Sequence, residues 1–217
     1  MGHFQSGSSQ FDQEDIRATE SALLTAAGGT QTSSAMLKQL SSTNEEFAYG
    51  STALANSLRE RRRVVIAANL CHESTGVSGL FGWECTHDAE GIELRPLAID
   101  LLRSQNFDHV ESGAIQLVGN GTRGDAIVVC DPFGDNELLL WALRVASRLS
   151  VVTIAITTHQ PNLLAALANH AIRVPAPTPN RQEYMVSALR HLVQAAGVSL
   201  VPARQRATGP LRALHFG

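Results

Sequence analysis

Side chains that can bind ligands or move protons stand at the ends of apolar runs in this sequence. Asp131 directly follows the run Ala126–Cys130, and Thr158 and His159 end the run that starts at Val151. Both runs are rich in β-branched residues, which predicts buried strands. The carboxyl ends of parallel strands meet at one edge of an open sheet, where ligands commonly bind. We therefore expect these three side chains to face one crevice.

The segment between the two runs has the pattern of a tight loop followed by a helix. The loop from Asp131 to Asn136 contains turn and capping residues, and leucines and alanines then recur at helical spacing up to Ala146. We expect Asp131, Gly134 and Asn136 to contact a ligand. The alternative for Asp131 is a turn residue that caps the helix, and the alternative for His159 is an exposed turn histidine.

The loop predicted to follow an earlier strand, residues 69–74, holds a second group of reactive side chains. An imidazole next to a carboxylate is a candidate acid and base pair for proton transfer. The alternative is a solvated loop with a surface ion pair, in which the cysteine packs as a small buried side chain. The candidates are Asn69, Cys71 and Ser74 as ligand contacts and His72 and Glu73 as catalytic groups.

Cysteine and histidine also raise the question of a metal. Cys71 with His72 and Cys85 with His87 fit no standard zinc spacing. We therefore expect neither a metal nor a cofactor, with a divalent metal as the alternative. The three cysteines of the chain are scattered, which argues against a disulfide framework and favours the cytoplasm.

These candidates need a scaffold that brings strand ends together. Apolar runs alternate with helical patterns, which is typical of an α/β protein with a parallel sheet between two layers of helices. We expect a three-layer αβα fold with five parallel strands. The predicted strands lie at 64–68, within 92–99, and at 126–130, 151–156 and 171–174; helices are expected at 107–118, about 138–146, 163–168 and from 179 or 181 to 197, with a weak, glycine-containing candidate at 75–83.

The rest of the chain divides by composition. We expect a flexible start at 1–11, a helical segment at 12–62 that packs on the sheet or at a subunit interface, an α/β domain at 63–197, and a loose tail at 198–217. The last helix of the entry segment would be capped by Asn44 and would bury Phe47, Leu54 and Leu58.

The composition is that of a soluble globular protein, with 44% hydrophobic and 17% charged residues. A net charge of −3 argues against a nucleic-acid-binding surface. No apolar run approaches the roughly 18 residues that a membrane span needs. The apolar stripes of the first and last helical segments favour a homodimer or homotetramer.

The order and spacing of the elements resemble the sugar isomerase (SIS) domain, and within it the phosphoheptose isomerases, over roughly residues 44–195. The resemblance rests on Arg63–Asn69, Arg95–Asp100, Gly124–Leu143, Val151–Thr157 and Ala171–Glu183. It implies a Rossmann-like or flavodoxin-like αβα fold, an oligomer, and a sugar phosphate as the small-molecule partner. It also implies isomerisation between an aldose and a ketose.

Both ligand loops depart from the family pattern. The family's first loop reads Gly-Asn-Gly-Gly-Ser, of which Asn69 matches, and its second reads Ser-Thr-Ser-Gly-Asn-Ser, of which Gly134 matches. Asp131, Pro132 and Asp135 remove hydrogen-bond donors from the second loop and add negative charge. We therefore expect a ligand that is less anionic than a sugar phosphate, such as an amino sugar or an unphosphorylated sugar.

The catalytic positions of the family are also changed. Its acid and histidine lie on the helix after the first loop, where this chain has Ser78 and Gly82. On the last helix Gln182 matches the family's glutamine and is a candidate ligand contact, but the histidine eight residues later is Arg190, with His191 beside it. His191 is therefore a third catalytic candidate, and its alternative is a partly buried residue at the edge of an apolar stripe.

Together these patterns predict a SIS-fold protein that binds a sugar or a sugar-phosphate derivative. A phosphoheptose-isomerase-like aldose–ketose isomerase is its enzymatic version. The alternative is a non-catalytic sensor of sugar derivatives, or a protein-assembly module, on the same fold.

Overall fold

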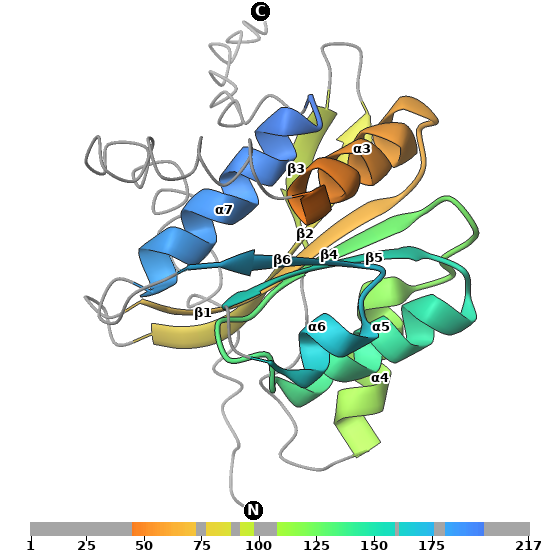
Figure 1. Ribbon diagram of the computed structural model, residues 1–217. Coiled ribbons are helices and arrows are strands. Elements are labelled where there is room, and N and C mark those ends of the chain that lie inside the picture. Colours follow the sequence, from red (N-terminus) through yellow and green to blue (C-terminus); the bar gives the residue numbers. More distant parts are fainter. Residues whose placement is uncertain are drawn as a thin grey trace, which may run out of the picture.

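The computed structural model describes residues 45–72, 77–87, 92–97, 108–158, 161–175 and 181–197. In this part of the chain one sheet lies between two layers of helices (Figure 1). The predicted three-layer α/β architecture is therefore confirmed. The helices predicted before residue 44, the flexible start and the loose tail lie outside the described residues.

Six strands and five helices are described, with the labels of Figure 1. The strands are β1 (Val64–His72), β2 (Val77–His87), β3 (Ile92–Pro96), β4 (Ala126–Cys130), β5 (Val152–Thr158) and β6 (His170–Val174); the helices are α3 (Glu45–Arg59), α4 (Asp108–Val118), α5 (Glu137–Arg148), α6 (Leu163–Leu167) and α7 (Arg181–Ala195).

The sheet is mixed, so the prediction of five parallel strands is wrong. Its order is β3-β2-β1-β4-β5-β6. The strands β1, β4, β5 and β6 run parallel, whereas β2 pairs antiparallel with β1 and with β3. The segment 92–99 was predicted as a parallel strand, and its described part forms the antiparallel edge strand β3. An edge position tolerates Pro96, which has no N–H to donate to a ladder.

The helix considered over residues 75–83 is also wrong, because the described part of this stretch, residues 77–83, belongs to β2. Glycine is costly in a helix interior, and the segment instead alternates between the faces of the sheet. Trp83 and Cys85 enter one core, while Leu80 packs against the other. Only residues 73–76 separate β1 from β2, and a parallel return needs a dozen or more residues.

Two cores hold the layers together. On one face, α3 and α7 cover the sheet, and on the other face α4, α5 and α6 cover it (Figure 1). The predicted apolar stripe of α3 is confirmed, since Phe47, Leu54 and Leu58 are all buried. The alternation of side chains along each strand assigns successive residues to opposite cores: Ile66 and Val128 face α3 and α7, and the next residues face α4 and α5.

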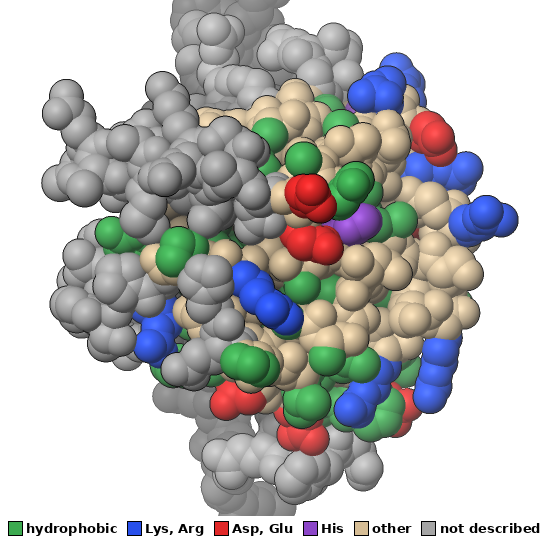
Figure 2. Space-filling model, viewed as in Figure 1, with side chains coloured by type: hydrophobic (Ala, Val, Ile, Leu, Met, Phe, Trp, Pro, Cys, Tyr) green, Lys and Arg blue, Asp and Glu red, His purple; other side chains and the backbone are tan. Residues whose placement is uncertain are grey.

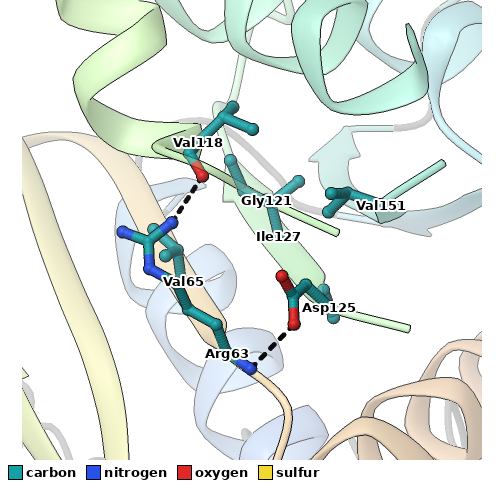
Figure 3. A pocket seen from close by; sticks show the side chains of 8 residues that line it. Arg63, Val65, Val118, Gly121, Asp125, Ile127 and Val151 are labelled. Carbon is teal, nitrogen blue, oxygen red and sulfur yellow. Dashed lines mark hydrogen bonds between the residues drawn. The ribbon is translucent and has the colours of Figure 1, made fainter. Parts of the chain in front are cut away.

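Arg63 and Asp125 form a hydrogen-bonded contact directly before the first residues of β1 and β4. The Arg63 amide donates to Asp125 Oδ1 at 3.0 Å, and its guanidinium donates to the carbonyls of Leu117 and Val118 at the end of α4 (Figure 3). Arg63 Nε also donates to Glu84 Oε1 at 2.8 Å. A cavity of about 10 Å³ lies beside Arg63 and Asp125 and is also lined by Val118 and Val151, with room for about one water molecule.

The surface of the described residues shows no broad field of one charge in Figure 2. Acidic, basic and hydrophobic side chains are interspersed on the face drawn there. Across the residues described, no helix is both long enough and apolar enough to span a bilayer.

Candidate functional site

The carboxyl ends of β4 and β5 lie side by side with Asn69 of β1, as the sequence predicts. Two side-chain hydrogen bonds join them. Asn69 Nδ2 donates to Asp131 Oδ1 at 3.1 Å, and Thr158 Oγ1 donates to the carbonyl of Pro132 at 2.8 Å. The backbone amide of Asp131 also donates to the carbonyl of Ile156 at 3.1 Å. The second loop is therefore held between the two neighbouring strand ends.

Alternation along the strands explains why polar side chains gather here. Asn69, Asp131 and Thr157 each follow by two positions a residue of the core under α5 and α6, so they point to the same face. Asp131 and Thr157 are both fully buried. Since a buried polar group is costly unless it is hydrogen-bonded, both side chains need hydrogen-bond partners within the protein.

Asp131 finds its partners in its own loop and in β1. Oδ2 accepts hydrogen bonds from the backbone amides of Asp135 and Asn136, both at 3.0 Å, and Oδ1 accepts from Asn69. These two amides directly precede the first residue of α5, where backbone N–H groups have no partner within the helix. The carboxylate therefore organises the turn, which fits the capping alternative considered for Asp131.

Asn136 is the N-cap of α5. Its backbone is extended, and its side-chain oxygen accepts a hydrogen bond from the Leu139 amide at 3.1 Å. The side chain is partly buried, whereas that of Asp135 is exposed. Asn136 was predicted as a ligand contact, and in this structure its oxygen stabilises the first turn of the helix.

Gly134 allows a second capping residue to pack against the loop. Its φ angle is +70°, and a Cβ atom built on it would lie 2.3 Å from Cγ of Asn162. Asn162 caps α6 through the Ala165 amide and donates to Thr157 Oγ1 at 2.9 Å. Glycine therefore meets two needs here, a left-handed backbone and a close approach.

Asn162 was missed as a member of this site. The sequence did carry a signal, since an asparagine after a proline and before a leucine and alanine run is an N-cap pattern. Its contact with Thr157 and with Gly134 depends on the packing of α6 and was not readable from that pattern.

An aromatic and cationic contact connects the loop to the last helix. Phe133 is 60% exposed, and the guanidinium carbon of Arg181 lies 4.9 Å from the centre of its ring. That distance is within the range of a cation–π interaction. The sequence predicted Arg181 only as a helix start. The beginning of α7, which includes Gln182, therefore lies beside the second loop.

The first-loop candidates are placed differently from the prediction. Asn69, Cys71 and His72 lie in β1, because the strand continues to His72 by pairing with β2 after β4 has ended. The loop predicted at 69–74 is therefore wrong in its first four residues. The side chains of Cys71 and His72, and the whole of Glu73, Ser74 and His159, lie outside the described residues.

The candidates on α7 are far apart from each other. Gln182 follows the first residue of the helix, and its side chain lies outside the described residues. His191 is partly buried and lies ten residues after Arg181, which corresponds to about 15 Å along a helix axis. The start of α7 is close to the second loop, and His191 is well removed from that start.

The chemistry of the described cysteines is suppressed by burial. Desolvation raises the pKa of the Cys130 thiol well above its usual range, and the nearby Asp131 adds to the effect. Desolvation, with a smaller effect of Glu84, raises the pKa of Cys85 to about 12. Neither thiol is a nucleophile near neutral pH, because the thiolate is the reactive form. Among the described side chains, no three histidine, cysteine or carboxylate groups are arranged to hold a metal ion.

Comparison with known proteins identifies the fold. No protein-family model matches the sequence, and a search of curated proteins found no relative. Among solved structures, a phosphoheptose isomerase from Francisella tularensis is 16% identical, with a TM-score of 0.51, and the match covers 84% of this chain and 96% of that chain. A phosphoheptose isomerase from Neisseria gonorrhoeae is 18% identical over 85% of this chain and 96% of its own, with a TM-score of 0.47.

The likeness to the Francisella protein shows a fold of the phosphoheptose isomerase, or SIS, type. At this identity the likeness concerns the fold alone, and the function has to be argued from the site.

Proposed function

We propose that this protein binds a sugar or sugar derivative where the carboxyl ends of β4 and β5 lie beside Asn69 of β1. The observation that carries the proposal is the pair of hydrogen bonds Asn69 to Asp131 and Thr158 to Pro132, which connects the loop after β4 to both neighbouring strands. Ligands of open α/β sheets bind at this edge. The fold shared with a phosphoheptose isomerase supports a sugar derivative as the ligand.

Asn69 and Thr158 are the described polar side chains best placed to meet a ligand. Both are partly exposed, unlike Asp131 and Thr157. An amide and a hydroxyl offer both donors and acceptors, which suits the hydroxyl groups of a sugar. From the sequence, the proposed ligand contacts still include Cys71, Ser74, His159 and Gln182. The proposed catalytic groups are Glu73, His72 and His191.

A thermal-shift panel tests the binding proposal. Sugar phosphates, neutral sugars and amino sugars are added separately, and a ligand that binds only the folded state raises the unfolding temperature. We expect stabilisation by at least one class, and a loss of that stabilisation in Thr158→Val, which keeps the shape and removes the hydroxyl. No stabilisation by any class of sugar would contradict the proposal.

The enzymatic version is an aldose–ketose isomerase. Such a reaction needs a base beside the carbonyl carbon and a group that stabilises the enediolate oxygen. We expect turnover to be lost in Glu73→Gln or in His191→Ala if these groups supply the chemistry. Turnover that survives both substitutions would exclude these assignments.

One observation favours the non-catalytic alternative, a sensor or assembly module. The SIS family, which this sequence resembles, carries its acid and histidine on a helix after the first loop. Residues 77–87 of this chain instead form the strand β2. Ser78 and Gly82 lie in that strand, paired with Cys71 and Ala67 of β1. Ligand binding without turnover of any aldose or ketose supports this alternative, and measurable turnover contradicts it.

A further inference from the structure

We propose that the Asp131 carboxylate is a built-in occupant of the anion-binding backbone at the start of α5, so that the ligand of this site carries no phosphate there. Asp131 would thus determine specificity. The inference rests on the proposed function for its ligand, and on the structure alone for the occupied backbone.

The backbone amides of Asp135 and Asn136 are consecutive and directly precede α5. Both donate to one oxygen atom, Oδ2 of Asp131, at 3.0 Å. Consecutive amides at the start of a helix favour a negative charge through their hydrogen bonds and through the helix dipole. In this protein that negative charge is supplied by the chain itself.

Burial makes the Asp131 carboxylate costly to displace from these amides. Asp131 has no solvent exposure, and its other oxygen accepts from Asn69 at 3.1 Å. A phosphate at the two amides would have to displace the carboxylate and leave it buried without these donors, which is strongly unfavourable. It would also stand beside a like charge in a poorly solvated place. Both effects act against phosphate.

Other polar groups of the site remain exposed and available to a ligand. The loop's exposed charge is the carboxylate of Asp135, and the partly exposed polar side chains at the strand ends are Asn69 and Thr158. These groups match hydroxyls or an ammonium group better than a dianion. The ligand class that follows is a neutral or amino sugar rather than a sugar phosphate.

Inorganic phosphate is the probe that tests the occupied backbone. Amide ¹H–¹⁵N spectra of the full chain are recorded with increasing phosphate, for the wild type, Asp131→Ala and Asp131→Asn. We expect the Asp135 and Asn136 amides to stay unperturbed in the wild type and to shift in Asp131→Ala. Because Asp131→Ala frees both amides to make charge-assisted hydrogen bonds, we expect phosphate to bind this variant at least about tenfold more tightly than the wild type.

A matched control separates occupancy from charge in general. Asp135→Asn removes one negative charge from the same loop and leaves Asp131 in place, so its amides should remain unperturbed. A response of Asp135→Asn equal to that of Asp131→Ala would overturn the inference. If Asp131→Ala does not fold, Asp131→Asn keeps the side-chain shape and removes the charge. Its amide oxygen can still accept from both backbone amides, so its phosphate response should be smaller than that of Asp131→Ala and larger than that of the wild type.

The remaining outcomes are also decisive. Phosphate-dependent shifts of both amides in the wild type would overturn the inference directly. Unperturbed amides in every folded variant would overturn it as well, because the backbone would then not be an anion site. A sugar panel without any binder would contradict the proposed function and leave the phosphate result standing, so the two failures can be told apart.

Discussion

Asn69 and Asp131 connect two neighbouring parallel strands, directly after their last paired residues, through a hydrogen bond of 3.1 Å between Nδ2 and Oδ1. The bond connects residues that are 62 positions apart in the sequence. Because the Asp131 carboxylate is buried, each of its donors stabilises a charge that water cannot reach. This contact makes the second loop part of the folded core rather than a flexible rim.

Asn69→Leu should therefore destabilise the protein. Leucine has nearly the same shape and lacks the donor, and a hydrogen bond to a charged group contributes about 1.5–3 kcal/mol. Urea unfolding of the single variants and of Asn69→Leu with Asp131→Asn measures the coupling. If the two substitutions were additive, the bond would contribute nothing to stability.

Gly134→Ala should be more damaging than Gly197→Ala. Both glycines have a positive φ angle, of +70° and +88°, but a Cβ atom at Gly134 meets Asn162 at 2.3 Å, whereas nothing lies within 4 Å at Gly197. We expect about 1 kcal/mol for Gly197→Ala, from the left-handed backbone alone. For Gly134→Ala we expect several kcal/mol in the free energy of unfolding, in the range of overpacking effects.

Equal losses for the two glycine variants would show that the close approach of Asn162 does not restrain the loop. Asn162→Ala in the Gly134→Ala background provides the check, since removal of the amide should recover part of the loss.

Arg63→Lys should destabilise the protein more than Arg62→Lys. Arg63 donates to two terminal carbonyls of α4 and to Glu84, and one ammonium group cannot reproduce this planar arrangement. Arg62 is more exposed and has a 3.6 Å contact with Glu60, a type of pair that contributes little. We expect about 1–3 kcal/mol for Arg63→Lys and less than about 0.5 kcal/mol for Arg62→Lys.

Thermal unfolding at matched pH measures both arginine variants. A loss at Arg62 as large as that at Arg63 would contradict the assignment of the α4 terminus to Arg63.

Stability should fall at alkaline pH because of the buried thiols. The pKa of Cys85 is raised to about 12 in the folded state from the ordinary value of 9.0, and that of Cys130 is raised as well, both mainly by desolvation. An unfolded chain therefore releases these protons at lower pH than the folded chain does. The stabilising effect is complete below pH 9 and is lost as pH rises from 9 toward 12.

Cys130→Ala should reduce this alkaline loss, measured as the difference between free energies of unfolding at two pH values. Peptide mapping after alkylation provides an independent check, with Cys85 and Cys130 modified only in denaturant. Rapid modification of either cysteine in the native protein at neutral pH would contradict their burial.

Much of the scaffold was predictable because its signals are local. The β-branched runs predicted β4 and β5 nearly to the residue, and the spacing of Leu138, Leu139 and Ala142 predicted α5. The adjacency of Asn69 and Asp131 also followed from parallel order. The predictions for Glu73, Ser74 and His159 lie outside the described residues and stay predictions.

The partly wrong predictions concern long-range pairing. Residues 77–87 contain Gly79 and Gly82, which weakened a helix without indicating which strand they would join. The register of β2 on β1, and hence the extension of β1 to His72, depends on contacts that no local pattern reports.

By itself, the sequence determined the α/β class, most of the parallel strands, and the polar residues at their ends, because hydrophobic periodicity and capping residues act over a few neighbouring positions. Only the tertiary structure decided that β2 runs antiparallel to β1 and to β3, and that the Asp131 carboxylate accepts hydrogen bonds from the amides of its own loop. The physical reason is that a buried carboxylate must be satisfied by whichever donors folding brings within reach, and here one of them comes from a strand 62 residues away.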